Sequence, residues 1–143
     1  MNTKRYCYSC DLKDDSKLIA EYKEYHAKGN AWPEITKSIK DAGIVDLEIY
    51  LTGNRMFMIM EVDETFDPVK KAEMDSNNPK VQEWENLMWN YQQELPWAKD
   101  GEKWIALEEV FNSVPTLEPI TAILFLAKSS RSVKNIPCST SYP

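Results

Sequence analysis

Hydrophobic residues recur along this chain with two different spacings, and each spacing predicts a different backbone element. Apolar side chains at every third or fourth position predict helices over residues 16–28, 33–42, 69–76 and 79–94. Runs rich in β-branched, aromatic and methionine side chains predict strands over residues 5–12, 45–51, 56–62 and 104–111. The predicted order is therefore strand, two helices, two strands, two helices, strand.

Residues with capping and turn-forming side chains mark the ends of these elements. A polar residue among 14–16 can cap the first helix, and Gly29-Asn30 ends it. Pro33 suits the first turn of the second helix, because proline lacks the amide proton that would have no partner there. Residues 52–55 suit a hairpin, so we expect the two strands beside them to pair antiparallel.

This order predicts an α+β fold, a ferredoxin-like antiparallel sheet with helices on one face. The strands at 45–51 and 56–62 carry apolar residues on both faces, so the face without helices needs a second cover. Two copies packed sheet to sheet, forming a dimeric α/β barrel, would supply that cover. We therefore expect a homodimer.

The 143 residues are enough for one compact domain, which we assign to residues 1–112. Residues 113–143 form a C-terminal extension that is interrupted by prolines and ends in a serine-rich segment, so we expect it to be partly disordered. Within it, residues 120–127 are almost entirely apolar and could form an extra strand or a short helix.

Charge and hydropathy exclude several classes of partner. The net charge is −6, and no run of lysine and arginine is long enough to track phosphates, so nucleic acid is not expected as a partner. No apolar stretch approaches the roughly 20 residues that span a membrane, and the N-terminus leads into a strand instead of a secretory signal. We expect a cytoplasmic protein without a membrane partner.

Three cysteines raise the question of a metal site. Cys7 and Cys10 form a Cys-x-x-Cys pair, but zinc needs further ligands, and the rest of the chain offers only Cys138 and one histidine. A strand would also place Cys7 and Cys10 on opposite faces of the sheet. We interpret them as structural thiols instead of metal ligands or disulfide partners, and predict no metal.

His26, the single histidine, is the leading candidate for proton transfer near neutral pH. Tyr22 lies four residues earlier on the predicted helix, so both side chains project from one face. The alternative is that a histidine near a helix end only bonds the terminal carbonyls. Five tryptophans and seven tyrosines favour a sugar pocket, which needs flat aromatic walls together with groups that both donate and accept hydrogen bonds.

Five segments, in this order, closely resemble the L-rhamnose mutarotases: Tyr22–His26, Trp32–Glu34, Leu47–Tyr50, Gly53–Met58 and Pro79–Trp84. The resemblance covers residues 4–111. It implies a homodimer without a cofactor, of ferredoxin-like fold, that interconverts the α and β anomers of L-rhamnose or a related 6-deoxy hexose. It also implies that His26 is the proton donor and that Tyr22 binds the sugar.

The chain departs from the family at three places near the expected site. Five residues separate His26 from Trp32, whereas the family usually has three. Leu47 stands where some members carry a tyrosine, which removes one hydroxyl. Trp84 and Glu85 stand where some members carry two tryptophans. We expect Trp84 to form an apolar wall, and Glu85 either to accept a hydrogen bond from the sugar or to be a solvated helix residue.

The chemistry that this resemblance implies is general acid–base ring opening, with the base not assigned by the sequence. The alternative is a small-ligand-binding protein, or a haem-degrading or monooxygenase-type enzyme, on the same dimeric ferredoxin-like scaffold, since one scaffold hosts many functions. A Soret band in the purified protein would favour the haem alternative.

Overall fold

The computed structural model describes residues 2–114. Residues 2–107 belong to one compact unit, whereas residues 108–114 belong to a second unit and contain no helix or strand. The predicted extension at 113–143 therefore lies outside the described residues, apart from its first two positions. The domain boundary at residue 112 stays a prediction.

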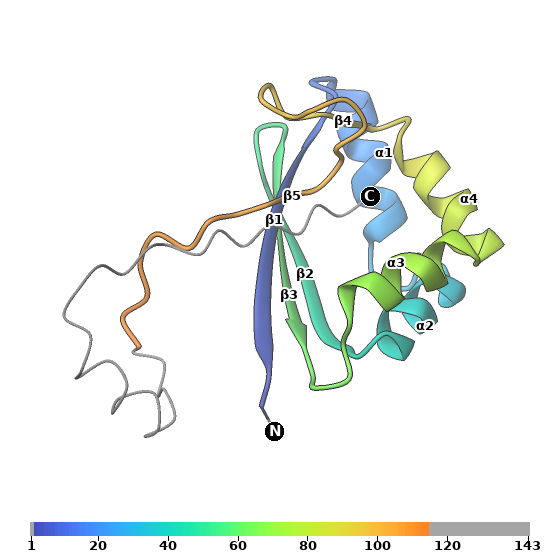
Figure 1. Cartoon of the computed structure of the whole chain (residues 1–143). Helices are drawn as coiled ribbons and strands as arrows, with labels where there is room; N and C mark the ends of the chain where they lie inside the picture. Colours follow the sequence, from blue (N-terminus) through green and yellow to red (C-terminus); the bar gives the residue numbers. More distant parts are fainter. Residues whose placement is uncertain (1, 115–143) are drawn as a thin grey trace. The chain divides into compact units, whose positions relative to one another are not determined.

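The compact unit is an antiparallel sheet with four helices on one face (Figure 1). The helices are α1 (Ser16–His26), α2 (Pro33–Asp41), α3 (Pro68–Ser76) and α4 (Pro79–Met88). The strands are β1 (Lys4–Leu12), β2 (Ile44–Thr52), β3 (Arg55–Val62), β4 (Gln92–Gln93) and β5 (Ile105–Ala106). The α+β class and the ferredoxin-like arrangement predicted from the sequence are confirmed. No helix within residues 2–114 is long and apolar enough to cross a membrane.

Strand β1 is the centre of the sheet. The order is β2-β3-β1-β4, and β5 also pairs with β1. The β2–β3 hairpin turns at Gly53 and Asn54, as predicted. Asn54 then ties this turn to the end of β1, because its carbonyl oxygen accepts from the amide of Leu12 at 2.6 Å and its side-chain amide donates to the carbonyl of Leu12 at 2.9 Å.

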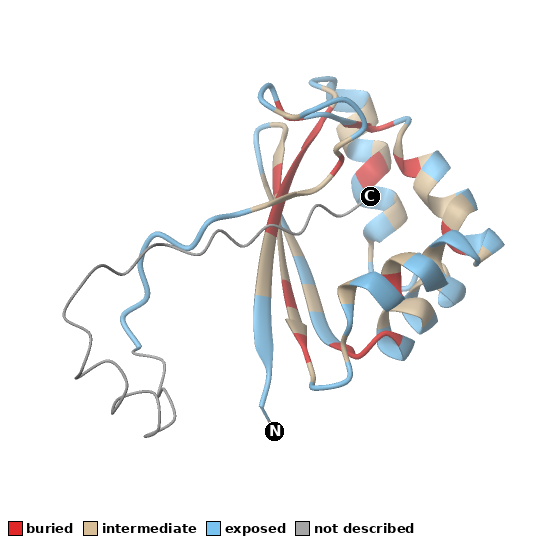
Figure 2. Ribbon diagram, in the orientation of Figure 1, coloured by how far each residue is buried: buried red, intermediate tan, exposed pale blue. Residues whose placement is uncertain are grey.

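Side chains from the helix-facing side of the sheet and from the helices above it form two groups of buried residues. One group lies beneath α1 and α4 and comprises Cys10, Leu12, Tyr22, Met56, Met88 and Tyr91. The other comprises Tyr8, Ala42, Ile44, Met60 and Val62. Figure 2 shows buried positions along β1 and β3 and on the inward sides of the helices. Each large side chain buried in this way stabilises the fold by about 1.5–3 kcal/mol.

Three of the helices begin at a side-chain cap. Asp15, Asp67 and Asn78 each accept hydrogen bonds from the amides two and three residues later, at the starts of α1, α3 and α4. In α3 and α4 the cap is followed by a proline, Pro68 or Pro79, whose missing amide proton costs nothing in the first turn. These caps set where each helix starts above the sheet.

The helix predicted over residues 79–94 ends six residues early, at Met88. Tyr91 has helical spacing, but it enters the core after the helix has ended. The chain turns there because Gln92 and Gln93 pair with β1, and the amide of Lys13 donates to the carbonyl of Tyr91 at 2.8 Å. Pairing with the sheet therefore outweighs the helical pattern.

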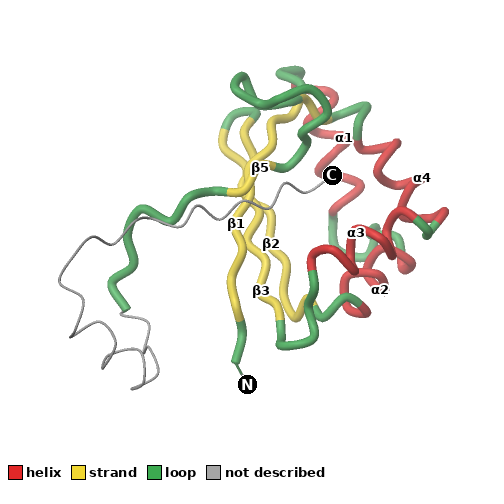
Figure 3. Tube along the Cα trace, in the orientation of Figure 1, coloured by secondary structure: helices red, strands yellow, loops and turns green. Residues whose placement is uncertain are grey.

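The strand predicted over residues 104–111 is shorter than expected. Only Ile105 and Ala106 pair with β1, and the last connection to it is the amide of Leu107, which donates to the carbonyl of Cys7 at 2.8 Å. Between β4 and β5 the chain forms a loop (Figure 3). Alternating apolar residues do not distinguish a paired strand from an extended loop, so the pattern overstated the strand.

We predict that Gly43→Ala destabilises the protein more than Gly29→Ala does. Both glycines have a positive φ, 88° and 89°, so each substitution carries the cost of a left-handed conformation, about 1–2 kcal/mol. At Gly43 the new Cβ would also lie 2.5 Å from Oγ1 of Thr65 and 2.6 Å from Oδ1 of Asp63, whereas nothing lies within 4 Å at Gly29. Chemical unfolding measures the difference. Equal losses in the free energy of unfolding would show that the turn at Asp63 shifts to make room for the new Cβ without an energetic cost.

Candidate functional site

A cavity of about 420 Å³ lies between the sheet and the helices. Its floor consists of helix-facing residues of β2 and β3: Leu47, Ile49, Met58 and Met60. Tyr22 and Met88 from one group of buried residues line it, and so do Tyr8 and Ile44 from the other group. The cavity thus separates the two groups, and its size suits a small molecule.

All four candidate site residues, Tyr22, His26, Trp84 and Glu85, line this one cavity. The His26 ring stacks on Tyr22 with its centroid 4.2 Å away, and its other neighbour is Trp84, 5.3 Å away and tilted by 65°. Trp32 meets Trp84 at 5.1 Å. These rings form an aromatic corner with the only imidazole of the chain between two of them.

The backbone of α1 orients His26. Nδ1 lies 2.8 Å from the carbonyl oxygen of Tyr22, one turn earlier. A carbonyl oxygen only accepts, so Nδ1 carries the proton and, in the neutral ring, Nε2 keeps its lone pair. The side chain is exposed at one edge, yet the packed rings remove enough water to lower its pKa, against the opposing effect of this hydrogen bond. His26 therefore both bonds a backbone carbonyl near the end of its helix, which was the alternative considered from the sequence, and lines the cavity.

Tyr22 and Gln92 form the polar part of the cavity wall. Tyr22 is buried, and burial raises the pKa of its hydroxyl, so the hydroxyl stays protonated. The side chain of Gln92, from β4, hydrogen-bonds it. The Oε1 atom of Gln92 is buried and has no hydrogen-bond partner among the described residues. A ligand hydroxyl in this part of the cavity can supply that missing donor.

Charged side chains line another part of the cavity. Lys71 of α3 pairs with Asp75 at 2.6 Å. Glu85 is half-buried, and the loss of water raises the pKa of its carboxyl. Lys103, in the loop before β5, is 8% exposed. No sequence pattern indicated Lys103 or Gln92, because a polar residue in a loop or in a two-residue strand adds nothing to a hydrophobic pattern.

Other residues singled out from the sequence do not converge on this cavity. Trp97 is 63% exposed. Cys10 is buried under the helices, where burial raises the pKa of its thiol to about 12, while Cys7 lies on the other face of the sheet, as predicted. Within residues 2–114, no group of three or more histidine, cysteine, aspartate or glutamate side chains is arranged to hold a metal ion.

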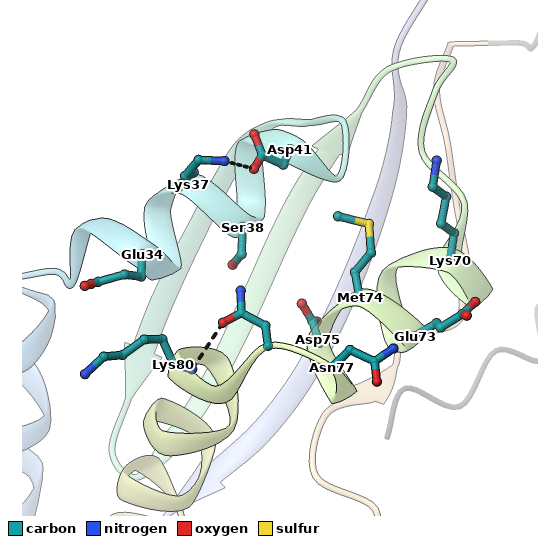
Figure 4. A pocket seen from close by; sticks show the side chains of 11 residues that line it. Glu34, Lys37, Ser38, Asp41, Lys70, Glu73, Met74, Asp75, Asn77 and Lys80 are labelled. Carbon is teal, nitrogen blue, oxygen red and sulfur yellow. Dashed lines mark hydrogen bonds and ion pairs between the residues drawn. The ribbon is translucent and has the colours of Figure 1, made fainter.

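A second hollow, of about 610 Å³, lies among α2, α3 and the start of α4 (Figure 4). Charged and polar side chains line it, and some already pair: Lys37 bonds Asp41, and Lys71 beside it bonds Asp75. None of its lining residues is aromatic. It therefore lacks the flat apolar wall that the first cavity offers to a sugar ring.

A family model described as L-rhamnose mutarotase matches residues 5–113. The chain belongs to this family. It is therefore a sugar mutarotase, an isomerase that interconverts anomers, and the comparisons favour this function over the small-ligand, haem and monooxygenase alternatives.

The chain is also similar to individual proteins, two of which are named mutarotases. The chain is 44% identical over 111 residues to an L-fucose mutarotase of Xanthomonas campestris pv. campestris, covering 78% of this chain and 89% of the relative. It is 35% identical over 113 residues to a UPF0734 protein of Dictyostelium discoideum, covering 76% and 89%. The crystal structure of an L-rhamnose mutarotase from Formosa agariphila superposes with a TM-score of 0.56 at 28% identity, covering 76% of this chain and 97% of that one.

We predict that His26 titrates with a midpoint below 6.5, because desolvation favours the neutral ring. The stability linked to this group is fully present above the unfolded value of about 6.5 and is lost as pH falls through the folded pKa, because the unfolded chain then binds the proton more readily. NMR of the ring protons measures the midpoint without an assignment problem, since there is one histidine. A midpoint at or above 6.5 would contradict the packing described here.

Proposed function

We propose that this enzyme interconverts the α and β anomers of L-rhamnose or a related 6-deoxy hexose such as L-fucose. The observation that carries the proposal is the placement of the single imidazole between Tyr22 and Trp84 in the cavity wall. The similarity to an L-fucose mutarotase and to an L-rhamnose mutarotase supports the class of sugar. It does not choose between the two.

His26 moves the proton in this proposal. Ring opening takes a proton from the anomeric hydroxyl and gives one to the ring oxygen; rotation about C1–C2 and closure then form the other anomer. Because the pKa of His26 is lowered, its resting form is neutral, and Nε2 accepts the proton of the anomeric hydroxyl and returns it to the ring oxygen as the bond from C1 to that oxygen breaks. Closure is the reverse step, so the same nitrogen then acts as the proton donor that the family resemblance implies.

The other candidate residues bind the sugar. Trp84 provides an apolar wall for the C–H face of the ring, and Tyr22 donates its hydroxyl proton to a sugar oxygen while Gln92 holds that hydroxyl in place. Glu85 accepts a hydrogen bond from a sugar hydroxyl. The reaction moves protons and breaks and re-forms one C–O bond without a change of oxidation state, so the proposal includes no cofactor and no metal.

We predict that His26→Ala folds but loses roughly 100- to 10,000-fold of the catalysed anomer exchange, since the chain has no second imidazole. Exchange NMR between the α and β anomeric protons, recorded separately for L-rhamnose and for L-fucose, measures this rate.

Tyr22→Phe loses one hydroxyl and keeps the ring, so we predict that KM rises about 2- to 10-fold with a smaller loss of kcat.

Tyr25→Phe is the matched control for Tyr22→Phe. Tyr25 also packs against Trp84, with ring centroids 6.1 Å apart, but it does not line the cavity. It should therefore keep the rate and KM of the unmutated enzyme. Exchange at the unmutated rate in His26→Ala would remove His26 from the mechanism, and an inactive Tyr22→Phe that still binds sugar would make Tyr22 the proton-transferring group.

We also propose that the enzyme is a homodimer formed through the sheet face opposite the helices. Neighbouring strands place Phe57 beside Tyr50, and Ile59 one step away, on this face. Tyr50 is 54% exposed. Aromatic and aliphatic side chains gathered on an uncovered face of a sheet favour a second copy as the cover.

Light scattering at micromolar concentrations should therefore give twice the chain mass of 16.6 kDa. Tyr50→Lys places a charge in the proposed interface and should shift the protein toward one chain. Val69→Lys is the control, because Val69 is 78% exposed on α3, away from this face. A single-chain mass for the unmutated protein would rule out the dimer.

A further inference from the structure

Lys103 is held in place by backbone contacts on both sides. Before it, a turn closes through hydrogen bonds of 3.0 Å from the amide of Lys99 to the carboxylate of Glu102 and from the amide of Glu102 to the carbonyl of Lys99. After it, Ile105 pairs with Ser9 of β1. The side chain between these two anchors lines the cavity. Its inward direction is thus built into the loop.

Two buried lysines line this cavity, and only one of them is neutralised. Lys71 and Lys103 are 9% and 8% exposed. Lys71 forms an ion pair with Asp75, whereas no ion pair or hydrogen bond within residues 2–114 uses Nζ of Lys103. That Nζ lies over the ring of Trp89, 5.2 Å from the ring centroid. Its side chain is buried, but its Nζ is not among the buried polar atoms without a partner, so the ammonium keeps contact with water in the cavity. A ligand hydroxyl can take the place of that water.

Glu85 is the group of opposite charge that faces Lys103. Each shifts the other's ionisation toward the charged form, while burial opposes both charges. They do not form an ion pair among the described residues. A sugar hydroxyl in the cavity can therefore bond either group without breaking an existing ion pair.

We propose that Lys103 contacts the sugar and determines which sugar is preferred, with its ammonium donating to one hydroxyl oxygen while Glu85 accepts from a neighbouring hydroxyl. This inference rests on the proposed mutarotase function and adds a residue to its binding site. The ammonium only donates and the carboxylate only accepts, so at fixed positions they favour a sugar whose hydroxyls on two adjacent carbons point toward both groups. A sugar with the opposite configuration at one of these two carbons loses one of these contacts.

The charges also indicate that the ligand is neutral. Two lysines and two carboxylates line this part of the cavity, Lys71 with Asp75 and Lys103 with Glu85, and their formal charges cancel. An anionic sugar, such as a phosphate or an acid, would meet the carboxylates as well as the lysines. A neutral hexose satisfies both without leaving a net charge in the cavity.

Lys103→Met tests this inference, because methionine keeps the length of the side chain and removes its donor. We expect kcat/KM for the preferred sugar to fall about 10- to 100-fold, as for the loss of a hydrogen bond from a charged group. The ratio of kcat/KM between L-fucose and L-rhamnose, which measures the preference, should move toward one. The melting temperature should be maintained, since Nζ of Lys103 makes no ion pair or hydrogen bond among the described residues that the substitution could remove. Lys99→Met, an exposed lysine in the same loop, is the matched control and should change neither quantity.

The outcomes separate the two proposals. If the unmutated enzyme accelerates exchange and Lys103→Met keeps both its rate and its preference, Lys103 does not contact the sugar and this inference alone is wrong. An equal loss of rate for both sugars with a lower melting temperature would assign Lys103 a structural role and also overturn it. If Lys103→Met does not fold, Glu85→Gln must narrow the preference, and an unchanged preference there overturns the inference. If the unmutated enzyme accelerates anomer exchange of neither sugar, the proposed function is wrong, and this inference with it.

Discussion

The rest of this structure depends on the incomplete filling of the space between the sheet and its helices. Close packing normally leaves few voids in a domain of this size. Here two groups of buried residues pack at either side, and the cavity between them takes the place of a continuous core. Stability then comes from the two groups of buried residues together with the pairing of β1 and the three capped helices, and the space between the groups is left for ligand contacts.

The position of the proton-transferring group follows from where α1 ends. Asp15 fixes the start of the helix, and eleven residues later His26 is its last residue. Near that end the carbonyl of Tyr22 is available to the imidazole, so one ring nitrogen is committed to the backbone and the other remains for chemistry. The same helix brings the hydroxyl of Tyr22 to the cavity, and Trp84 of α4 covers the imidazole from the other side.

Local patterns were sufficient for most of the fold. Alternating side chains predicted β2 and β3, the Gly53-Asn54 pair predicted their hairpin, and polar and proline residues predicted where α1 and α2 begin. They failed where a distant strand competes for the backbone, as at Tyr91, and where pairing stops without a change in hydrophobicity, as at Leu107.

The candidate site shows the same limit. Helical spacing placed Tyr22 and His26 together, and the resemblance to the L-rhamnose mutarotases added Trp84 and Glu85. Lys103 reaches the same cavity through a turn and a two-residue strand that pairs with β1, nearly one hundred residues away along the chain. Only the folded chain brings that amine to the carboxyl of Glu85, so no spacing in the sequence indicates it.

The central claim is that the backbone holds His26 as a neutral ring with its proton on Nδ1 and Nε2 available to the sugar. A long-range proton–nitrogen correlation spectrum of the single histidine tests this most directly, near neutral pH and with sugar added. The account predicts the neutral Nδ1–H tautomer without sugar and a shift of the Nε2 resonance when sugar binds. A ring protonated on Nε2 before sugar is added, or an Nε2 resonance unaffected by bound sugar, would contradict it.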